Sequence, residues 1–259
     1  MKTSPILEHK HYAQPSVFTP ANLLREARRQ KAIPAGKVPR ICVLDPDGDL
    51  WRHLRDRGAE RSPFWACYHT DLYEMAVNGE TIGVLGCAVG APFAVLVAEE
   101  LFASGCEFLV SVTSAGQIVA AQQPPYIVFI DRALRDEGTS QHYLPPARYA
   151  YCPQRSLGIA KAALKRWGNA RLGGSWTTDA PFRETEQAIT YARSEGLYAV
   201  EMEAAALYAL AEVKSYPILC IAHVTNSMAQ SGNDFEKGEQ SGNHAFIGLV
   251  STLIDLWNG

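Results

Sequence analysis

The sequence predicts an α/β fold in a single domain, with a central mixed β-sheet flanked by helices. The chain has 259 residues, of which 47% are hydrophobic and 20% are charged, so it can bury one large core. Short, continuously apolar runs of strand length alternate along the chain with amphipathic stretches of helical length. Several apolar runs end in acidic, hydroxyl-bearing or small residues, and α/β sheets usually bind ligands at such carboxyl ends of their strands.

The composition argues against several classes of protein. A formal net charge of −3 gives no basis for binding nucleic acid or an anionic membrane. No apolar run approaches the roughly 20 residues of a membrane-spanning helix, and residues 1–15 lack the apolar core of a secretory signal. The six cysteines lie mostly in apolar runs without CxxC spacing, which favours free thiols over a zinc site or a disulfide framework. We therefore expect a cytoplasmic protein without a metal centre.

The N-terminal region, residues 1–37, is expected to form an arm and one helix, and the main domain is expected to span residues 38–259. Thr19 and Pro20 are typical of a helix N-cap and first turn, so a helix is predicted over residues 21–30. The basic residues of this helix are typical of a solvated face.

The domain is expected to begin with a strand over 38–45, which leads through the polar loop 45–49 into a helix from Leu50. Strands over 64–77 and 80–87 flank Asn78-Gly79, a pair typical of a two-residue hairpin turn. The remaining pattern predicts, in order, a helix over 93–103, strands over 107–112 and 126–130, a polar loop over 131–146, a helix over 155–167, strands over 172–178 and 216–225, and a closing helix over 243–257.

Two glutamates near residue 200 form the centre of the predicted site. Apolar residues run into Glu201, Met202 and Glu203, and a run of strong helix formers follows, which predicts a strand end, a short turn and a helix. On extended backbone the two glutamates point to opposite sides, so one can face a pocket while the fold holds the other. The alternative is that both simply complement the dipole in the first turn of the helix.

The run Glu201-Met202-Glu203, followed by two alanines, resembles the Glu-Met-Glu signature of the nucleoside phosphorylase-I family. This family includes purine nucleoside phosphorylases, uridine phosphorylases and related nucleosidases, and the resemblance extends from about Arg40 to the C-terminus. It implies that Met202 and Glu203 hold the ribose hydroxyls of a nucleoside. Hydrogen bonds from sugar hydroxyls to a carboxylate strengthen as the sugar becomes oxocarbenium-like, which suits cleavage of an N-glycosidic bond.

A second similarity concerns phosphate. The run from Gly48 to Arg52 resembles the family's Gly-Asp-Pro-x-Arg motif without its proline, which implies that the Gly48 amide and the Arg52 guanidinium bind phosphate. Ser114 matches a further phosphate-binding position. Ser111 stands where phosphorylases of the family carry an arginine, and residues 67–71 contain no arginine where the family has another.

A third similarity concerns the base. The Asp-Ala-Pro-Phe-Arg-Glu-Thr run at 179–185 resembles a base-binding segment found in several subgroups of the family. This resemblance implies that Phe182 stacks on the base. Arg183 reaches the base or makes a structural ion pair. Asn226 stands where the purine enzymes carry an aspartate as general acid. An asparagine hydrogen-bonds a base but does not donate a full proton, so this catalytic candidate favours a pyrimidine, a 6-oxopurine or another carbonyl-bearing base.

Three functions remain open. The resemblance first implies a nucleoside phosphorylase that releases a purine or pyrimidine base and ribose 1-phosphate, with inorganic phosphate as co-substrate and no metal or organic cofactor. The absent arginines keep open a nucleosidase that uses water. The departures from the family pattern at Ala88, Ser111 and Thr113 keep open a non-catalytic nucleoside-binding protein. The resemblance also implies a homo-oligomer, either a dimer or a hexamer.

Overall fold

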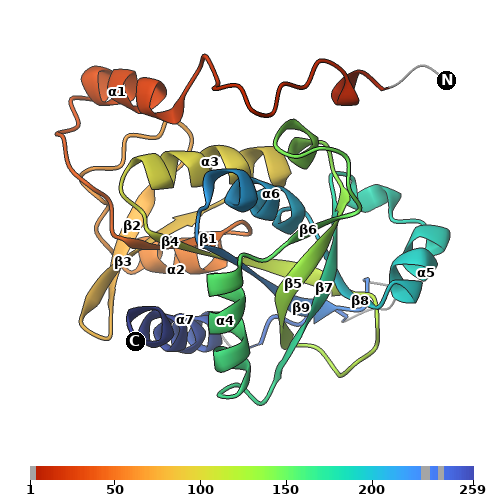
Figure 1. The fold of residues 1–259 in the computed structure, drawn as a ribbon. Helices are drawn as coiled ribbons and strands as arrows, with labels where there is room; N and C mark the ends of the chain where they lie inside the picture. The colour runs from red at the N-terminus through yellow and green to blue at the C-terminus, as the bar shows by residue number, and fades with distance from the viewer. Residues whose placement is uncertain (1–3, 229–233, 239–241) are drawn as a thin grey trace.

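The computed structural model describes residues 4–228, 234–238 and 242–259. Within them, nine strands form one mixed sheet with helices on both faces (Figure 1). The strands are β1 (Ile41–Asp45), β2 (Leu72–Val77), β3 (Glu80–Gly86), β4 (Phe108–Gln117), β5 (Tyr126–Asp136), β6 (Tyr149–Tyr151), β7 (Ala170–Thr178), β8 (Leu197–Glu201) and β9 (Ile218–Asn226). The helices are α1 (Pro20–Lys31), α2 (Asp49–Asp56), α3 (Ala91–Ala103), α4 (Gln154–Leu164), α5 (Glu186–Ser194), α6 (Ala204–Lys214) and α7 (Asn243–Asn258), with the short 3₁₀ helices η1 (Pro5–Leu7), η2 (Thr139–His142) and η3 (Pro181–Arg183).

Five of the strands close into a ring. β4 pairs in parallel with β9, β9 antiparallel with β5, β5 in parallel with β7, and β7 in parallel with β8, which returns antiparallel to β4. β1, β3 and β2 extend the sheet from the other side of β4. Because β1, β3, β4 and β9 run parallel, their carboxyl ends lie at the same edge. β8 reaches this edge too, since its Val200 pairs with Gly116 near the end of β4.

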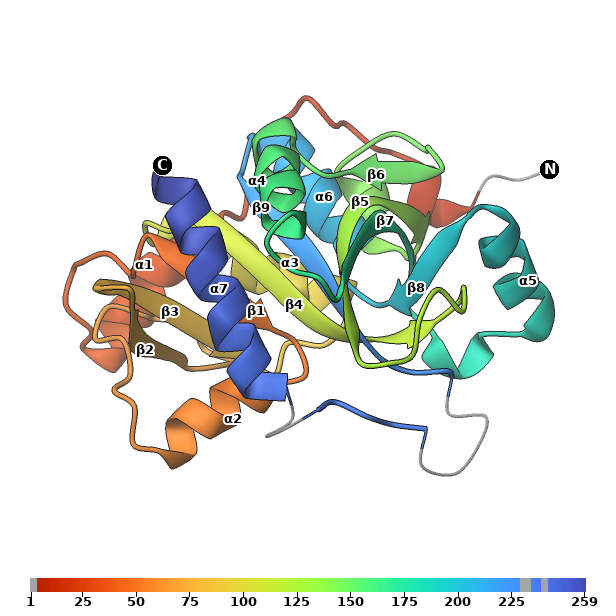
Figure 2. The same ribbon diagram turned by 90° about the horizontal axis from the view of Figure 1, so that it is seen from below.

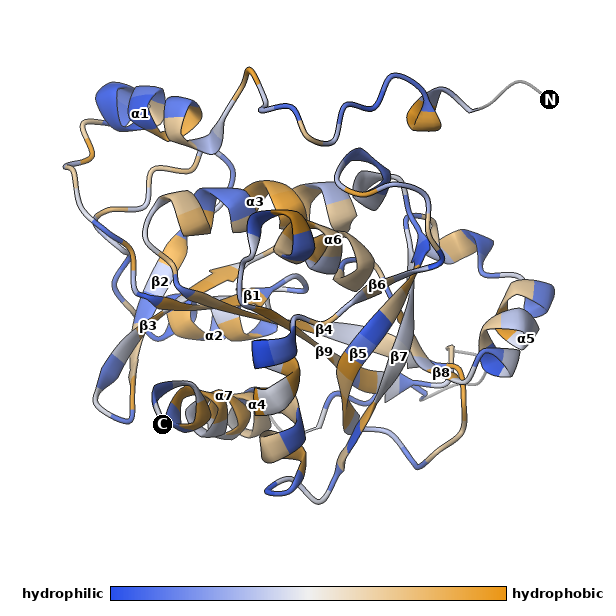
Figure 3. Cartoon of the chain, in the orientation of Figure 1, coloured by the Kyte–Doolittle hydropathy of each residue, from blue (hydrophilic) through white to orange (hydrophobic). Residues whose placement is uncertain are grey.

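The helices cover the sheet in two layers. Figure 1 shows α3 and α6, which contact each other, over one face, and α4 and α7 over the opposite face. Seen from below, α7 crosses that second face beside α2 (Figure 2). Figure 3 shows that α1 is largely hydrophilic, whereas α6 is mostly apolar. In the described part of the chain, no helix has both the length and the hydropathy that a membrane crossing requires.

Helix α6 fixes the position of the residues just before it. Its first eight residues, 204–211, are all buried, as expected for a helix that is apolar on every side. Tyr208 ties it to two strands, because its hydroxyl donates to Ile130 O at 2.6 Å and accepts from Cys220 N at 3.1 Å. A buried helix held at mid-length cannot shift without breaking these bonds, so its N-terminus is well placed to carry a site.

The predicted fold class is confirmed, and most elements lie within a few residues of their predicted bounds. Thr19 caps α1, and its side chain accepts a hydrogen bond from Asn22 N at 3.2 Å. Asn78 and Gly79 both have positive φ values, 53° and 79°, as a type I′ hairpin turn requires.

Two predicted elements are wrong in part. The strand predicted over 64–77 begins only at Leu72, and Trp65, Ala66 and Cys67 before it are buried in a loop. In that loop Trp65 Nε1 donates to Thr70 O at 2.8 Å, so burial without a strand accounts for the apolar pattern. Residues 131–136, predicted as part of a polar loop, continue β5, because β7 and β6 pair with this segment and so favour extended backbone despite its polar composition.

The N-terminal arm lies against η2. Lys10 Nζ is 2.9 Å from His142 Nδ1, and the Tyr12 hydroxyl donates to Gln141 O at 3.3 Å. The arm is therefore attached to the domain through few polar contacts, while residues 1–3 of the predicted arm lie outside the described residues.

Candidate active site

Strand ends and helix starts meet at the edge of the sheet where Glu203 lies. The contact that joins them is made by Gly90, whose backbone N–H donates to Glu203 Oε1 at 2.7 Å. Gly90 directly precedes α3 and has a φ of 94°, a conformation that favours glycine because it has no Cβ. The starts of α3 and α6 are thus held together by a carboxylate.

Glu201 is the structural member of the glutamate pair. Its Oε1 accepts hydrogen bonds from Ser175 Oγ at 2.9 Å and Thr177 Oγ1 at 2.5 Å, both on β7. Its Oε2 accepts from the backbone N–H groups of Glu203 and Ala204, each at 2.7 Å. Four donors satisfy this buried carboxylate, so it joins β8, β7 and the start of α6 and is not free to bind a ligand.

Glu203 lies in a different environment. It is 1% exposed, and Gly90 N is the hydrogen-bond donor to its Oε1. Its Oε2 is buried and has no hydrogen-bond partner among the described residues. A buried carboxylate oxygen without a donor is unfavourable, and such groups in folded proteins often mark functional positions. Met202, between the two glutamates, is half-buried.

The two carboxyl groups differ in protonation. Burial and the charge of Glu201 raise the pKa of Glu203 to about 8, although the Gly90 amide and the Thr113 hydroxyl act in the opposite direction. Burial also raises the pKa of Glu201, but its four hydrogen-bond donors favour the charged form. We therefore assign the charge of the pair to Glu201 and the proton to Glu203 in the free protein at neutral pH.

The Gly48 amide, predicted to bind phosphate, is bonded within its own loop. Gly48 N donates to Asp45 O at 2.9 Å and to Asp45 Oδ1 at 3.1 Å. Asp45 Oδ2 accepts from Trp51 N at 3.0 Å, so this aspartate caps the turn into α2. Burial raises the pKa of Asp45 to about 6. Gly48 has a φ of 79°, and an added Cβ would lie 2.5 Å from Cys87 Sγ, so the turn depends on glycine.

Arg52 projects from α2 beside the same loop. Its Nη2 donates to Asp47 O at 2.6 Å and to Asp49 Oδ1 at 3.3 Å. Its Nη1 is 3.5 Å from the thiol of Cys87, an exposed residue with a φ of 60°. The Arg52 side chain is 44% exposed, so the guanidinium keeps donors that can reach a ligand.

The third predicted phosphate group, Ser114, contacts an aspartate that the sequence reasoning did not single out. Asp47 Oδ2 accepts a hydrogen bond from Ser114 N at 2.6 Å. The two residues come from the end of β1 and from β4, and 67 positions separate them in the chain. The three aspartates at 45, 47 and 49 are visible in the sequence, but no local pattern indicates that one of them reaches Ser114.

Two further polar residues line this region and were also missed. Lys237 forms an ion pair with Asp49, with Nζ 2.5 Å from Oδ2. His223 is the residue of β9 that pairs with Ser114, and it lies against Phe246 with a ring separation of 4.9 Å. Burial and the positive charge of Lys237 lower the pKa of His223 to about 4, so it is neutral at physiological pH.

Asn226 ends β9 next to the end of β4, where it pairs with Gly116. Its Oδ1 accepts from Met228 N at 2.9 Å, and its Nδ2 donates to Thr225 Oγ1 at 3.0 Å. Because Met228 N is a donor, the amide oxygen must face it, and among the described residues the second hydrogen on Nδ2 has no acceptor and can donate to a ligand. The side chain is buried and held in one orientation by both bonds.

Phe182 and Arg183 lie apart from these groups on η3. Phe182 is 99% exposed, and Arg183 is exposed as well. Asp179, at the start of the same run, accepts a hydrogen bond from Gly138 N at 2.8 Å, which ties this segment to the loop before η2. The structure of one chain thus brings Glu203, Ser114 and the loop at 45–49 together, whereas Phe182 stacks on no ring among the residues that the structure describes.

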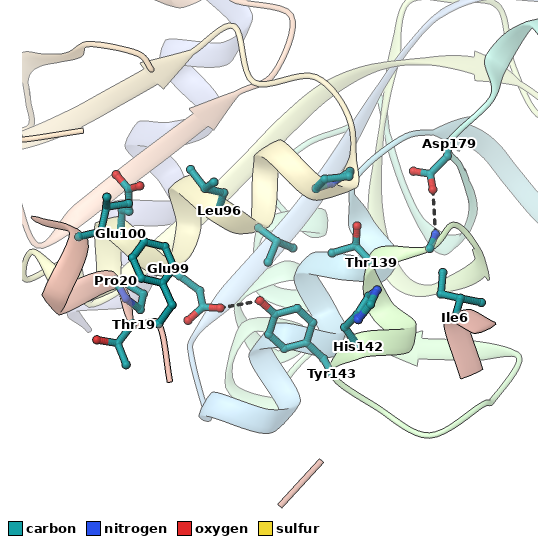
Figure 4. Close-up of a pocket in the computed structure, with 15 residues that line it drawn as sticks. Ile6, Thr19, Pro20, Leu96, Glu99, Glu100, Thr139, His142, Tyr143 and Asp179 are labelled. Carbon is teal, nitrogen blue, oxygen red and sulfur yellow. Dashed lines mark hydrogen bonds between the residues drawn. The ribbon is translucent and has the colours of Figure 1, made fainter. Parts of the chain in front are cut away.

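A separate cavity of about 560 Å³ lies between the N-terminal arm, α3 and η2 (Figure 4). The Tyr143 hydroxyl donates to Glu99 Oε1 at 2.5 Å across it, and Leu96 and Ile6 contribute apolar walls. Glu100 borders it with a buried carboxyl group, whose pKa burial raises. Glu203, Asp47 and Ser114 are not among its lining residues, so this cavity and the polar site are distinct.

No cluster of three or more His, Cys, Asp or Glu side chains suited to a metal ion occurs within 4–228, 234–238 and 242–259. The acidic groups of the site instead bond to backbone amides, hydroxyls, one arginine and one lysine, as given above.

The family of the chain follows from a comparison with protein-family models. The model of the phosphorylase superfamily matches residues 40–255. This match covers most of the chain, and the chain therefore belongs to the phosphorylase superfamily. The residues before position 40 lie outside the match.

Several similar proteins are nucleoside phosphorylases. The guanosine phosphorylase of Halorubrum lacusprofundi is 25% identical over 208 residues, covering 80% of this chain and 79% of that protein. The uridine phosphorylase of Thermococcus kodakarensis is 25% identical over 223 residues, covering 76% and 78% of the two chains. The crystal structure of uridine phosphorylase from Vibrio fischeri, complexed with 6-hydroxy-1-naphthoic acid, superposes with a TM-score of 0.72 at 20% identity, covering 86% of this chain and 93% of that one. This last likeness shows the fold.

Proposed function

We propose that the protein is a nucleoside phosphorylase, which cleaves the N-glycosidic bond of a purine or pyrimidine nucleoside with inorganic phosphate. The products are the free base and ribose 1-phosphate. The observation that carries the proposal is the Glu203 carboxyl group, buried beside Gly90 with Oε2 lacking a hydrogen-bond donor among the described residues. A ribose hydroxyl is the kind of donor that would complete this oxygen.

Glu203 acts on the sugar. As the bond to the base breaks, positive charge develops on the ribose ring, and an ionised carboxylate hydrogen-bonded to a ribose hydroxyl stabilises that charge. The buried position strengthens the effect, because the local dielectric is low and water is excluded. Glu201 holds the backbone of Glu203 in place through its bond from Glu203 N, so it is a positioning residue.

Asn226 acts on the base. Its free Nδ2 hydrogen can donate to a carbonyl oxygen or ring nitrogen, which accepts more strongly as the departing base gains negative charge. The bond from Met228 N uses the amide oxygen, and the bond to Thr225 Oγ1 uses one Nδ2 hydrogen, which supports the other hydrogen as the donor to the base. This supports a base with a carbonyl group, such as uracil or a 6-oxopurine.

The phosphate is assigned to the groups around the start of α2. Arg52 supplies a partly exposed guanidinium, and the N-terminus of α2 favours an anion. The similar guanosine and uridine phosphorylases support phosphate as the acceptor of the sugar. In this assignment phosphate attacks the anomeric carbon while the base leaves with the electron pair of the glycosidic bond.

A nucleosidase is the second candidate, and two observations favour it. Ser111 is buried at the position where a phosphorylase of the family would carry an arginine, and the Ser114 amide is bonded to Asp47. Both features weaken the attraction for phosphate, and both are compatible with water as the acceptor of the sugar.

Product analysis tests the proposal. Uridine, cytidine, guanosine, inosine, adenosine and their 2′-deoxy forms are incubated with the protein in phosphate-free buffer and with added phosphate, and base and sugar products are quantified. Phosphate-dependent release of base with equimolar sugar 1-phosphate is expected, with carbonyl-bearing bases ahead of adenine. Release of free ribose at a rate independent of phosphate would establish the nucleosidase instead. Thermal stabilisation by a nucleoside without release of base under any condition would identify a binding protein.

A further inference from the structure

Two aspartates of the loop between β1 and α2 accept hydrogen bonds from the backbone amides of Gly48 and Ser114, two residues that the family resemblance assigns to phosphate, but they do so in different ways. Asp45 is 5% exposed and accepts from Gly48 N and Trp51 N, so it belongs to the turn itself. Asp47 is only half-buried, and among the described residues the single hydrogen bond to its carboxylate comes from Ser114 N. Asp45 is therefore part of the fold, whereas Asp47 can move without disturbing the turn.

The negative charge of Asp47 also affects other groups of the site. It contributes to the raised pKa of Glu203, and it acts on His223 in the opposite direction to Lys237. The same carboxylate is bonded to Ser114 N at 2.6 Å. A phosphate bonded to Ser114 N would have to share this place with a like charge.

The cations near Asp47 do not offset this repulsion. Arg52 donates to the backbone oxygen of Asp47, not to its carboxylate, and also pairs with Asp49. Lys237 pairs with Asp49 as well. Residue 111, on the strand that carries Ser114, is a buried serine. Positive charge is therefore directed to Asp49 and the loop backbone, away from the Ser114 amide.

We propose that Asp47 determines which nucleophile the enzyme uses, by competing with phosphate for the Ser114 amide and by accepting the proton of an attacking water. This deepens the proposed function and rests on its cleavage of the N-glycosidic bond. When phosphate displaces the carboxylate, the product is ribose 1-phosphate. While the carboxylate remains on Ser114 N, water is the nucleophile.

In the water reaction, every bond that forms is matched by one that breaks. The water oxygen forms a bond to the anomeric carbon, and the carbon–nitrogen bond breaks with its electron pair going to the base. One proton of the water passes to the Asp47 carboxylate, which later returns it to solvent, and the base nitrogen takes a proton from solvent. The net change is nucleoside plus water to free base plus ribose, and no further reactant is needed.

The first measurement is phosphate binding, which needs no knowledge of the nucleoside. Inorganic phosphate is titrated by calorimetry into the full chain and into Asp47→Ala and Asp47→Asn. Removing the competing charge should tighten phosphate binding by about tenfold or more in Asp47→Ala. Asp47→Asn, which removes the charge but keeps an acceptor for Ser114 N, should lie between it and the unchanged protein, and it serves as the test if Asp47→Ala does not fold. Unchanged phosphate affinity in the folded variants overturns the proposal.

The second measurement separates this proposal from the proposed function. With a nucleoside that the protein cleaves, Asp47→Ala should raise the ratio of ribose 1-phosphate to ribose at a fixed phosphate concentration and lower base release without phosphate. Asp56→Asn, at an exposed acid at the far end of α2, removes the same charge and should change neither. Equal product ratios in all proteins would overturn the role of Asp47 and leave phosphorolysis standing. Tighter phosphate binding without base release by any protein would confirm the competition at Ser114 and refute the catalytic function.

Discussion

The two halves of the proposed site differ in how their buried polar groups are satisfied. On the proposed sugar side, around Glu203 and Gly90, one buried carboxylate oxygen has no donor among the described residues. On the proposed phosphate side, around the loop 45–49, the amides of Gly48 and Ser114 are both bonded to carboxylates of the chain itself. The sugar side therefore requires a ligand to complete it, whereas the phosphate side is already complete.

This difference separates the part of the proposed site that would bind the ribose from the part that would select the acceptor of the sugar. Binding a ribose requires an acceptor that is held rigidly, and Glu203 is held by Gly90 and by the bond from its own N–H to Glu201. The acceptor of the sugar can vary between phosphate and water with few changes, because it depends on one loop and one strand end. The comparison predicts large effects from changes on the sugar side and smaller, acceptor-specific effects on the phosphate side.

The largest effect is expected for Glu203→Gln. The amide keeps an acceptor for Gly90 N but cannot carry the negative charge that stabilises the ribose in the transition state. Loss of a charge-assisted hydrogen bond of about 3 kcal/mol should lower kcat/KM by about 10²-fold, whether the acceptor is phosphate or water. The measurement is base release with and without phosphate, and a variant with full activity would remove Glu203 from the site.

Glu201→Gln is the matched control for this change. Its amide cannot accept hydrogen bonds from all four donors that the Glu201 carboxylate satisfies, so the variant should lose about 2–3 kcal/mol of unfolding free energy in urea. Glu203→Gln removes a buried group with a raised pKa and should not destabilise the fold at pH 8. If the unfolding free energy fell by the same amount in both variants, the distinction between a structural and a ligand-binding glutamate would be wrong.

The next effect is expected for Arg52→Ala, which tests the phosphate side. If phosphate contacts the guanidinium, loss of about 1.5–3 kcal/mol should raise the KM for phosphate by about 10–100-fold and leave base release without phosphate unchanged. Arg55→Ala is the control, since Arg55 lies on the same helix and pairs with Asp56. An equal loss with and without phosphate would assign Arg52 to the sugar or base instead.

The sequence was sufficient to predict those features of the fold and the site that depend on a local pattern of residues. Apolar runs and turn residues indicated the strands, and the alternation of extended backbone indicated two different environments for Glu201 and Glu203. The partners of these residues could not be predicted, because Ser175, Thr177 and Gly90 lie far from them in the chain. The bond between Asp47 and Ser114 was missed for the same reason. Whether a backbone amide is free for an anion depends on such contacts, and a motif reports only that the amide is present.

A pH profile sharpens the sugar side of the comparison. The pKa of Glu203 is raised to about 8, and a ribose hydroxyl needs the ionised form as its acceptor, so kcat/KM should rise with pH up to about 8 by as much as about tenfold per unit. The stability of the fold should change with pH in the opposite direction. The fold favours protonated Glu203, so this contribution to stability is complete below pH 4.5 and is lost as pH rises through about 8.

The stability of Glu203→Gln checks this directly. Relative to the unchanged protein, the variant should be more stable at pH 8, and the difference should vanish near pH 4. A constant difference across this range would mean that Glu203 is ionised in the free protein and that the rise in activity has another source.

The smallest effect is expected for Phe182→Ala, at a predicted base contact that a single chain leaves in solvent. Phe182 is 99% exposed, so its truncation should not change the stability of the fold. If the ring stacks on the bound base, loss of about 1 kcal/mol should raise the KM for the nucleoside about fivefold and leave the KM for phosphate unchanged. Tyr151→Ala, at a 60% exposed aromatic residue on β6, controls for the loss of an exposed ring. Equal KM values for the nucleoside in all three proteins would restrict the base contacts to the Asn226 side and leave the sugar side as the main source of affinity.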